Sequence, residues 1–482
     1  MNMKNRKEEH WTTCLDCKGQ GKKKKRIRKK ERLYHEWKQA QFEKESQKVE
    51  SPIAPEKSYL RCKKCAGTGL VRSEFLPEIK QQNYPHVAII GGGIGGMALA
   101  VACFHRQIPF TVYERDESFD ARSQGYGLTL QQASKAMEGF GITSLEQGVV
   151  STRHVVHNSK GIILGEWGMR KWIESGENKK PKKTNIHIAR QSLRLNLLKQ
   201  LGNDNNVQWG HQFLGFKQNE DASVTLNFKV NDKIIQKKAD LVVGADGIRS
   251  SVRKLLIGDD ITPLRYLGCI VILGICPLSV LKELNSDLLD SATVFQTANG
   301  HERIYMMPFT KDSIMWQLSF PLSEEEAKNL SAQGAKKLKE EACKRLPWHH
   351  PIPQILEATL EKNISGYPVY DRALLKPAFL KKWEQITLIG DAAHPMSPFK
   401  GQGANQALLD ALALARTITK GISTNWREVG IRKSILNQFE SEMLERSAIK
   451  VKESASAADF LHSEIVLHKG DEPRGKILKS SR

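Results

Sequence analysis

Three glycine-bearing turns, each following a short apolar run, are the residues most able to do chemistry in this chain. They lie at residues 91–96, 244–247 and 390–391. In a doubly wound α/β domain, such turns follow parallel strands and meet at one sheet edge, where a dinucleotide binds. The three turns together therefore predict one dinucleotide site built from distant segments.

The first turn reads GGGIGG, and its glycines have separate roles. Gly91 permits the tight turn, Gly93 lets a pyrophosphate approach the backbone, and Gly96 lets the next helix pack on the strand. The helix N-terminus then offers free N–H groups to the phosphates. Glu114 ends the following strand, where a carboxylate suits ribose hydroxyls. The alternative is a structural turn without a ligand.

The second and third runs are more specific. They read LVVGADGIRSSVR over residues 241–253 and GDAAHPMSPFKGQGAN over residues 390–405. With the first turn, they resemble the single-component (class A) FAD-dependent aromatic hydroxylases of the para-hydroxybenzoate hydroxylase type, over about residues 85–450. The run from Pro398 to Asn405 also resembles the tetracycline-inactivating members.

The resemblance implies an α/β fold with a Rossmann-like FAD domain of the glutathione-reductase type, an inserted substrate domain with a mixed or antiparallel sheet, and C-terminal helices. The implied segments are an N-terminal module and linker (1–83), FAD-domain parts (84–150, 186–260 and 381–420), substrate-domain parts (151–185 and 261–380) and a C-terminal helical segment (421–482).

The resemblance also implies which residues bind FAD. Asp391 would accept from the ribityl chain, Gly401 and Gly403 would let the backbone approach the isoalloxazine ring, and Arg194 would face the phosphates. Arg194 and Arg122 have the alternative of being ordinary surface salt-bridge arginines. The full implied set is Gly91, Gly93, Gly96, Glu114, Arg115, Arg122, Arg194, Asp246, Gly247, Asp391, Pro398, Gly401, Gly403 and Asn405.

The implied reaction is an NAD(P)H-dependent hydroxylation. NADPH docks transiently and reduces the flavin, and O2 then forms a flavin C4a-hydroperoxide that transfers oxygen to a small aromatic or polycyclic substrate. No second GxGxxG unit occurs, so no dedicated nicotinamide domain is expected. We identify no catalytic side chain. The alternatives are a flavin-dependent reductase or desaturase on this fold, and a binding protein with a vestigial flavin domain.

Alternating strand patterns over residues 291–320 are expected to form the substrate face. Tyr305, Met307, Phe309 and Gln317 are the substrate candidates by alternation. The alternative is that these side chains form only the core of a sheet.

Two CxxCxGxG motifs near the N-terminus predict a metal site. Cys14, Cys17, Cys62 and Cys65 could hold one tetrahedral zinc ion, and the glycines permit tight turns around it. The motifs resemble the zinc repeat of J-domain co-chaperones, although no J-domain is present. Redox-active or idle cysteines are the alternative.

The net charge of +21 is concentrated at the same end. Residues 1–80 carry 22 Lys and Arg against 11 Asp and Glu, about half of the total excess. The basic run at 22–30 is either a solvated helix or a contact for an anionic partner such as RNA, lipid or protein.

The uncharged stretch at 87–104 is expected to be a strand, turn and helix and not a membrane span. No apolar signal core is present at the N-terminus, so we expect a cytoplasmic protein.

Overall fold

The structure is a computed structural model that describes residues 10–25, 29–44, 59–121, 125–174, 185–202, 206–421 and 425–474. Arg122 and residues 26–28 of the basic run lie outside the described residues. Lys22–Lys24 of the same run form a strand paired with Tyr59–Arg61 and not the helix that was one alternative for this run.

A five-stranded parallel sheet gathers the three glycine-bearing turns. Its order is β12 (Val207–Gln208), β6 (Phe110–Tyr113), β5 (Val87–Ile90), β16 (Leu241–Gly244) and β22 (Ile386–Leu388). Every pair is parallel, so the carboxyl ends of β5, β16 and β22 lie at the same edge. The fully buried apolar strands β5, β16 and β22 are typical of a sheet covered on both faces.

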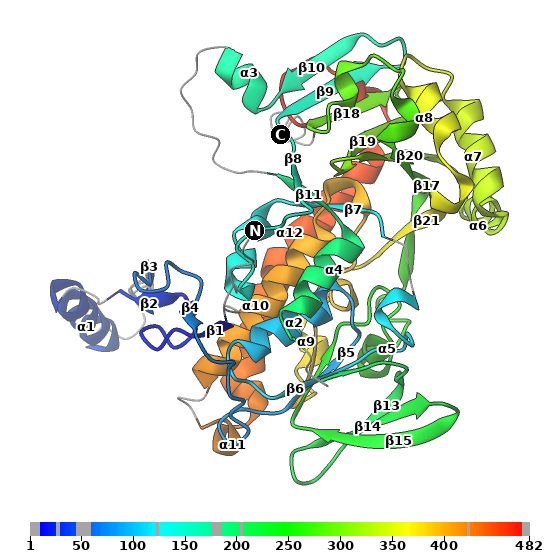
Figure 1. Ribbon diagram of the computed structural model, residues 1–482. Coiled ribbons are helices and arrows are strands. Elements are labelled where there is room, and N and C mark those ends of the chain that lie inside the picture. The colour runs from blue at the N-terminus through cyan, green and yellow to red at the C-terminus, as the bar shows by residue number, and fades with distance from the viewer. Residues whose placement is uncertain are drawn as a thin grey trace, which may run out of the picture.

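Long helices cover this sheet. Helix α2 (Ile94–Phe104) packs against α10 (Gly403–Gly421), and α12 (Asn437–Phe460) packs on α10 (Figure 1). Gly96 is required where α2 packs on the turn after β5, because a Cβ there would lie 1.9 Å from the carbonyl oxygen of Gly91. The stretch 87–104 is thus a strand, turn and helix as predicted, and none of the described helices is long and apolar enough to cross a membrane.

A seven-stranded mixed sheet forms the second body of the protein. Its order is β10 (Ile163–Trp167), β9 (Arg153–Asn158), β18 (Thr293–Ala298), β19 (Arg303–Thr310), β20 (Ser313–Pro321), β17 (Leu264–Pro277) and β21 (Ile364–Arg372). Only the β9–β18 pair is parallel. Helices α6 (Glu324–Ala332), α7 (Gly334–Arg345) and α8 (Ile352–Ala358) flank this sheet and share a buried apolar core with β17–β20 (Figure 1).

Two local predictions were wrong here. The polar sequence over residues 151–185 predicts irregular structure, yet β9 and β10 lie within this range because β9 pairs with β18 in the sheet. The sequence over residues 323–345 predicts one exposed helix, but the chain forms α6 and α7 there. The break is at Gly334, whose φ of +84° is not helical.

Smaller elements complete the fold. Strands β7 (Gly127–Leu130), β11 (Ile186–Ala189) and β8 (Val149–Val150) form one antiparallel sheet, and β13 (Gln212–Gln218), β14 (Val224–Val230) and β15 (Lys233–Ala239) form another. Helices α4 (Arg190–Lys199) and α5 (Ser251–Ile257) follow β11 and β16.

The N-terminal module lies to one side of the molecule (Figure 1). It consists of the pair β1 (His10–Thr13) with β4 (Leu70–Ser73), the pair β2 (Lys22–Lys24) with β3 (Tyr59–Arg61), and helix α1 (Lys29–Lys44). Both pairs are antiparallel, which brings residues 14–21 and 62–69 together.

One buried carboxylate ties α10 to the turn after β22. Asp410 accepts from the backbone N–H of Gly390 at 2.9 Å and lies 2.6 Å from Nε2 of His394. Its other oxygen accepts from Arg446 of α12. Burial alone would raise the pKa of Asp410, but His394 and Arg446 outweigh it and lower that pKa. Asp410 therefore stays charged and fixes three segments.

The variant Asp410→Asn tests this link. We expect it to reduce the free energy of unfolding by about 3 kcal/mol, since it leaves His394 and Arg446 without their common anion. Chemical denaturation followed by tryptophan fluorescence measures the change. Glu442→Gln, on the exposed part of α12, should stay within about 0.5 kcal/mol of the unmodified protein. Equal stability of all three proteins would contradict the role of Asp410.

Candidate functional site

One cavity of about 630 Å³ lies between the parallel sheet and the seven-stranded sheet. Its first wall is formed by the three turns, and its second wall by β17, β19, β20 and β21. Of the residues predicted to bind a cofactor or substrate, those lining it are Gly93, Gly247, Asp391, Pro398, Gly401, Gly403, Tyr305, Met307 and Gln317.

The first turn leaves open space at the position where a phosphate is expected. Gly91 has a φ of +108°, and a Cβ there would lie 2.7 Å from the carbonyl oxygen of Ala245. At Gly93, a Cβ would meet only a guanidinium nitrogen of Arg190, at 3.9 Å. Gly91 is therefore required by the fold itself, whereas the backbone of Gly93 faces the cavity with no side chain in between.

Glu114 lies against the backbone of this turn. Its Oε2 accepts from the N–H of Gly92 at 2.6 Å, and its Oε1 accepts from the N–H of Asp116 at 3.1 Å. The carboxylate thus links the ends of β5 and β6. It is not among the residues of the described chain that line the cavity.

The third turn brings a carboxylate and a helix N-terminus together. Asp391 is exposed to the cavity, and a Cβ built on Gly403 would lie 3.4 Å from its Oδ1. Gly403 is the first residue of α10, so the unpaired N–H groups of that helix begin here. Burial raises the pKa of Asp391, against the opposing charges of His394 and Arg190.

Asn405 shapes the cavity without facing it. Its Oδ1 accepts from the N–H groups of Gln131 and Ala133 at 2.9 and 3.2 Å, and its Nδ2 donates to the carbonyls of Thr129 and Gly401 at 2.8 Å each. Asn405 is 1% exposed, and all four contacts are with backbone. It holds β7 against the start of α10.

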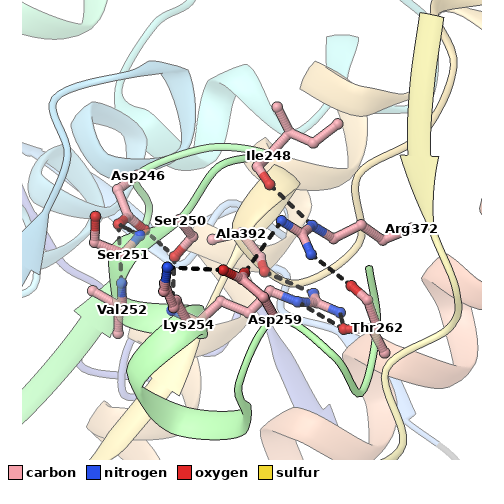
Figure 2. A network of polar contacts seen from close by, with 11 residues as sticks. Asp246, Ile248, Ser250, Ser251, Val252, Lys254, Asp259, Thr262, Arg372 and Ala392 are labelled. Carbon is pink, nitrogen blue, oxygen red and sulfur yellow. Dashed lines mark hydrogen bonds and ion pairs between the residues drawn. The ribbon is translucent and has the colours of Figure 1, made fainter. Parts of the chain in front are cut away.

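Asp246 in the second turn also has a supporting position (Figure 2). Its carboxylate accepts from the hydroxyl of Ser250 at 2.5 Å and from the N–H groups of Ser251 and Val252 at 2.7 and 3.2 Å, at the N-terminus of α5. Gly247 beside it has a φ of +83° and lines the cavity.

Two arginines outside the predicted cofactor-binding set join the second turn to its neighbours. Arg253 of α5 donates to the carbonyls of Ala392 and Ala393 at 2.9 and 2.8 Å. Arg372 of β21 donates to the carbonyls of Ile248 and Thr262 at 3.1 and 2.5 Å (Figure 2). The second turn is therefore tied to the third turn and to the seven-stranded sheet.

Of the predicted arginines, Arg194 is buried beside the cavity. Its Nε donates to the carbonyl of Gly92 at 2.7 Å, and its guanidinium lies over the rings of Phe119 and Trp209. Arg190, one helical turn earlier on α4, lines the cavity instead. Arg115 is exposed and outside the cavity lining.

The substrate candidates separate into two groups. Tyr305 and Gln317 are paired across β19 and β20, as are Met307 and Met315, and all four line the cavity. Phe309 does not line it and instead packs in a small cluster with Met307 and Met315.

Arg303 is a further cavity residue that alternation could have identified, because it precedes Tyr305 by two residues on β19. It is 5% exposed, and its Nε and Nη2 donate to Oε1 of Gln296 at 3.0 and 2.8 Å. No carboxylate pairs with it among the described residues. Burial lowers its pKa to about 10, so it remains a cation at neutral pH.

His187 of β11 lines the cavity but had no local sequence signal. Its Nδ1 lies 3.0 Å from the hydroxyl oxygen of Thr129. Burial lowers the pKa of His187 to about 3, so the imidazole is neutral at physiological pH.

The four predicted cysteine ligands form one buried cluster away from the cavity. All four Sγ atoms lie within 4.8 Å of one another, and those of Cys17 and Cys65 are 3.7 Å apart. A tetrahedron of thiolates about 2.3 Å from zinc has S–S edges of about 3.8 Å. The N–H groups of Gly21 and Gly69 donate to Cys17 and Cys65 at 3.2 and 3.3 Å. The cluster therefore fits a tetrahedral metal.

Comparisons with known proteins agree with the geometry of the cavity. Residues 84–446 match the protein family described as FAD binding domain. An aurachin C monooxygenase/isomerase of Stigmatella aurantiaca is 30% identical over 343 residues, which are 69% of this chain and 80% of that protein.

Solved structures share the fold. Klebsiella pneumoniae HpxO, solved with FAD and uric acid, is 19% identical with a TM-score of 0.63 and covers 82% of this chain and 92% of its own. The tetracycline destructase Tet(51) is 18% identical with a TM-score of 0.56 and covers 81% of this chain and 93% of its own.

The family match spans most of the chain, and it includes all three turns that meet at the cavity. The resemblance of residues 85–450 seen in the sequence is thus confirmed, and the chain belongs to the FAD-binding-domain family, as an FAD-dependent monooxygenase.

Proposed function

We propose that this protein hydroxylates a small aromatic substrate, with NADPH as the electron donor and O2 as the oxygen source. The cavity between the two sheets supports this proposal, because it joins the three turns of the FAD fingerprints to the sheet face that carries Tyr305 and Gln317. A flavin and a planar substrate placed in this space would lie in contact.

The residues of this chain fit FAD. Gly93 and the N-terminus of α2 would receive the pyrophosphate, and Asp391 would accept from the ribityl hydroxyls. Gly401 and Gly403 leave the backbone at the start of α10 open to the ring, where the helix N-terminus favours negative charge on the flavin. The bound flavin supplies the electron transfer and oxygen activation that side chains lack.

Arg303 and its surroundings indicate the chemistry of the substrate. A buried cation without a carboxylate partner favours a ligand that carries a negative charge or a strong acceptor such as a carbonyl oxygen. Tyr305 and Tyr367 line the same region and suit an aromatic ring. The proposed substrate is therefore an aromatic compound with an acidic or carbonyl group.

The variant Gly93→Ala tests the pyrophosphate position. Its φ of −72° and ψ of −171° accept alanine, and the nearest atom to the new Cβ is 3.9 Å away. We expect apoprotein stability to change by less than about 1 kcal/mol and the dissociation constant for FAD to rise by at least about tenfold. Flavin fluorescence titration measures this constant. Gly215→Ala, where the Cβ meets nothing within 4 Å, is the control. Unchanged FAD affinity in Gly93→Ala would refute the assignment.

The proposed reaction is tested by NADPH consumption of the FAD-loaded protein in air, with peroxide measured in parallel. In a panel of phenols, quinone precursors and tetracyclines, we expect compounds with an acidic or carbonyl group to accelerate NADPH consumption and to release less peroxide than the NADPH consumed.

The variant Arg303→Gln tests the proposed contact with the substrate. It should raise KM for those compounds by about tenfold or more, as loss of a charged hydrogen bond predicts, whereas Phe309→Leu should leave KM unchanged.

Two results would change the proposal. Peroxide equal to NADPH with every compound would mean that none of them is a substrate. Accelerated NADPH consumption without incorporated oxygen would favour the reductase or desaturase alternative: a product with two more hydrogens identifies a reductase, and a product with two fewer identifies a desaturase.

We further propose that Cys14, Cys17, Cys62 and Cys65 hold one structural zinc ion. The closed, buried set of four thiols supports it, since catalytic zinc sites keep an open position. Thiolates of this kind persist in a reducing compartment. We therefore propose that the protein is located in the cytoplasm.

Metal analysis tests the zinc site. Protein purified without chelator should contain about one zinc per chain, and Cys65→Ser should lose it while keeping its FAD. Cys343→Ser, outside the cluster, should retain both. Protein that contains no zinc and four free thiols would refute the site.

A further inference from the structure

Two arginines lie between the cysteine cluster and the helices behind the flavin site. Arg106 follows α2, and Arg416 belongs to α10. An Nη atom of Arg106 donates to the carbonyl of Thr68 at 3.4 Å, and one of Arg416 donates to the carbonyls of Gly67 and Thr68 at 3.1 and 3.0 Å. Both guanidinium groups therefore meet the second cysteine loop.

These arginines lack an anionic partner in the part of the chain that the structure describes. Arg106 is 0% exposed, and its remaining contacts are the carbonyls of Ala102 and Gly139 at 3.2 and 3.3 Å. The Nε atoms of Arg106 and Arg416 are buried without a hydrogen bond. A buried guanidinium without a counter-charge is costly, and two adjacent ones repel each other.

The glycines of the two cysteine motifs bring these cations close to the cluster. A Cβ on Gly69 would lie 3.2 Å from Nη2 of Arg106, and one on Gly21 would lie 2.9 Å from Nη2 of Arg416. Gly69 and Gly21 are also the residues whose N–H groups donate to Cys65 and Cys17. The arginines thus contact the same turns that surround the sulfur atoms.

The charges of the two sides match. A divalent ion with four thiolates carries a net charge of about −2, and the two arginines carry +2. Four protonated thiols would leave both cations uncompensated.

We propose that the metal-loaded cysteine cluster is the counterion of Arg106 and Arg416, and that this charge pairing fastens the N-terminal module to α2 and α10. The proposal rests on the zinc site proposed above. The surrounding contacts agree with it, since Gln20 of the module donates to the hydroxyl of Thr419 on α10 at 2.7 Å, and the hydroxyl of Thr13 donates to the carbonyl of His105 at 3.4 Å.

The rate of zinc release to an excess of a chromogenic chelator tests the pairing in the full-length protein. Arg416→Gln keeps a donor for the carbonyls but removes the charge, and we expect release to accelerate by about tenfold. Arg416→Lys keeps the charge and should stay near the unmodified rate. Lys63→Gln removes an exposed charge between two ligands, where solvent screens it, and should also stay near that rate.

A second measurement covers the case in which Arg416→Gln does not fold. In the unmodified protein, zinc removal should increase backbone hydrogen exchange at the end of α10 around residues 416–419 and after α2 around residues 104–107. The protein could contain one zinc per chain and still show equal release rates in all variants, or unchanged hydrogen exchange after zinc removal. Either result would overturn the counterion role but would not contradict the zinc site. Absence of zinc from the unmodified protein would overturn both.

Discussion

The buried charge of Asp410 is the constraint on which the rest of the site depends. The turn after β22 must present Asp391 and then return to start α10, and it contains few side chains able to stabilise it. Asp410 binds the backbone of Gly390 and the ring of His394 from inside α10, and Arg446 adds α12 to the same group. The N-terminus of α10 is thereby held at one place relative to Asp391.

Much of the remaining site is supported in the same indirect way. Both the oxygen and the nitrogen of the Asn405 amide form hydrogen bonds with backbone groups. Asp246 caps α5, and Arg253 joins α5 to the segment after Asp391. These polar side chains hold the backbone in position. The backbone itself, including glycines that have no side chain, then forms the surface that would contact the cofactor. Such preorganised N–H groups need no rearrangement when a charged ligand arrives.

The fold and the flavin side of the cavity could be predicted from the sequence because glycine requirements are local. Gly91 needs glycine for its φ of +108°, and Gly96 is fixed by its contact with Gly91 five residues earlier, so any chain with this turn needs them. Side-chain direction on α4 was not predictable in this way. Arg190 and Arg194 are one turn apart, and only the packing of Phe119 and Trp209 around Arg194 leaves Arg190 facing the cavity.

The substrate side shows a similar limit. Alternation selected one face of β19, and Tyr305 and Met307 on that face line the cavity, but alternation could not show where the cavity ends. Phe309 continues the alternation yet packs beyond the cavity, while Arg303, at the other end of the strand, lines it. Strands β9 and β10 were missed because β9 pairs with β18, a segment more than a hundred residues away, and β10 in turn pairs with β9.

The position of the N-terminal module limits what it can do for catalysis. Arg416 is 13 residues beyond the start of α10, which places it about 20 Å along the helix from the flavin end. At that distance, the cysteine cluster cannot exchange atoms with a ligand in the cavity. Its effect on the cavity has to pass through the stability and position of α2 and α10, and the other end of α10 is fixed by Asp410 and Asn405. The module thus acts on the same helix that presents its N-terminus to the flavin.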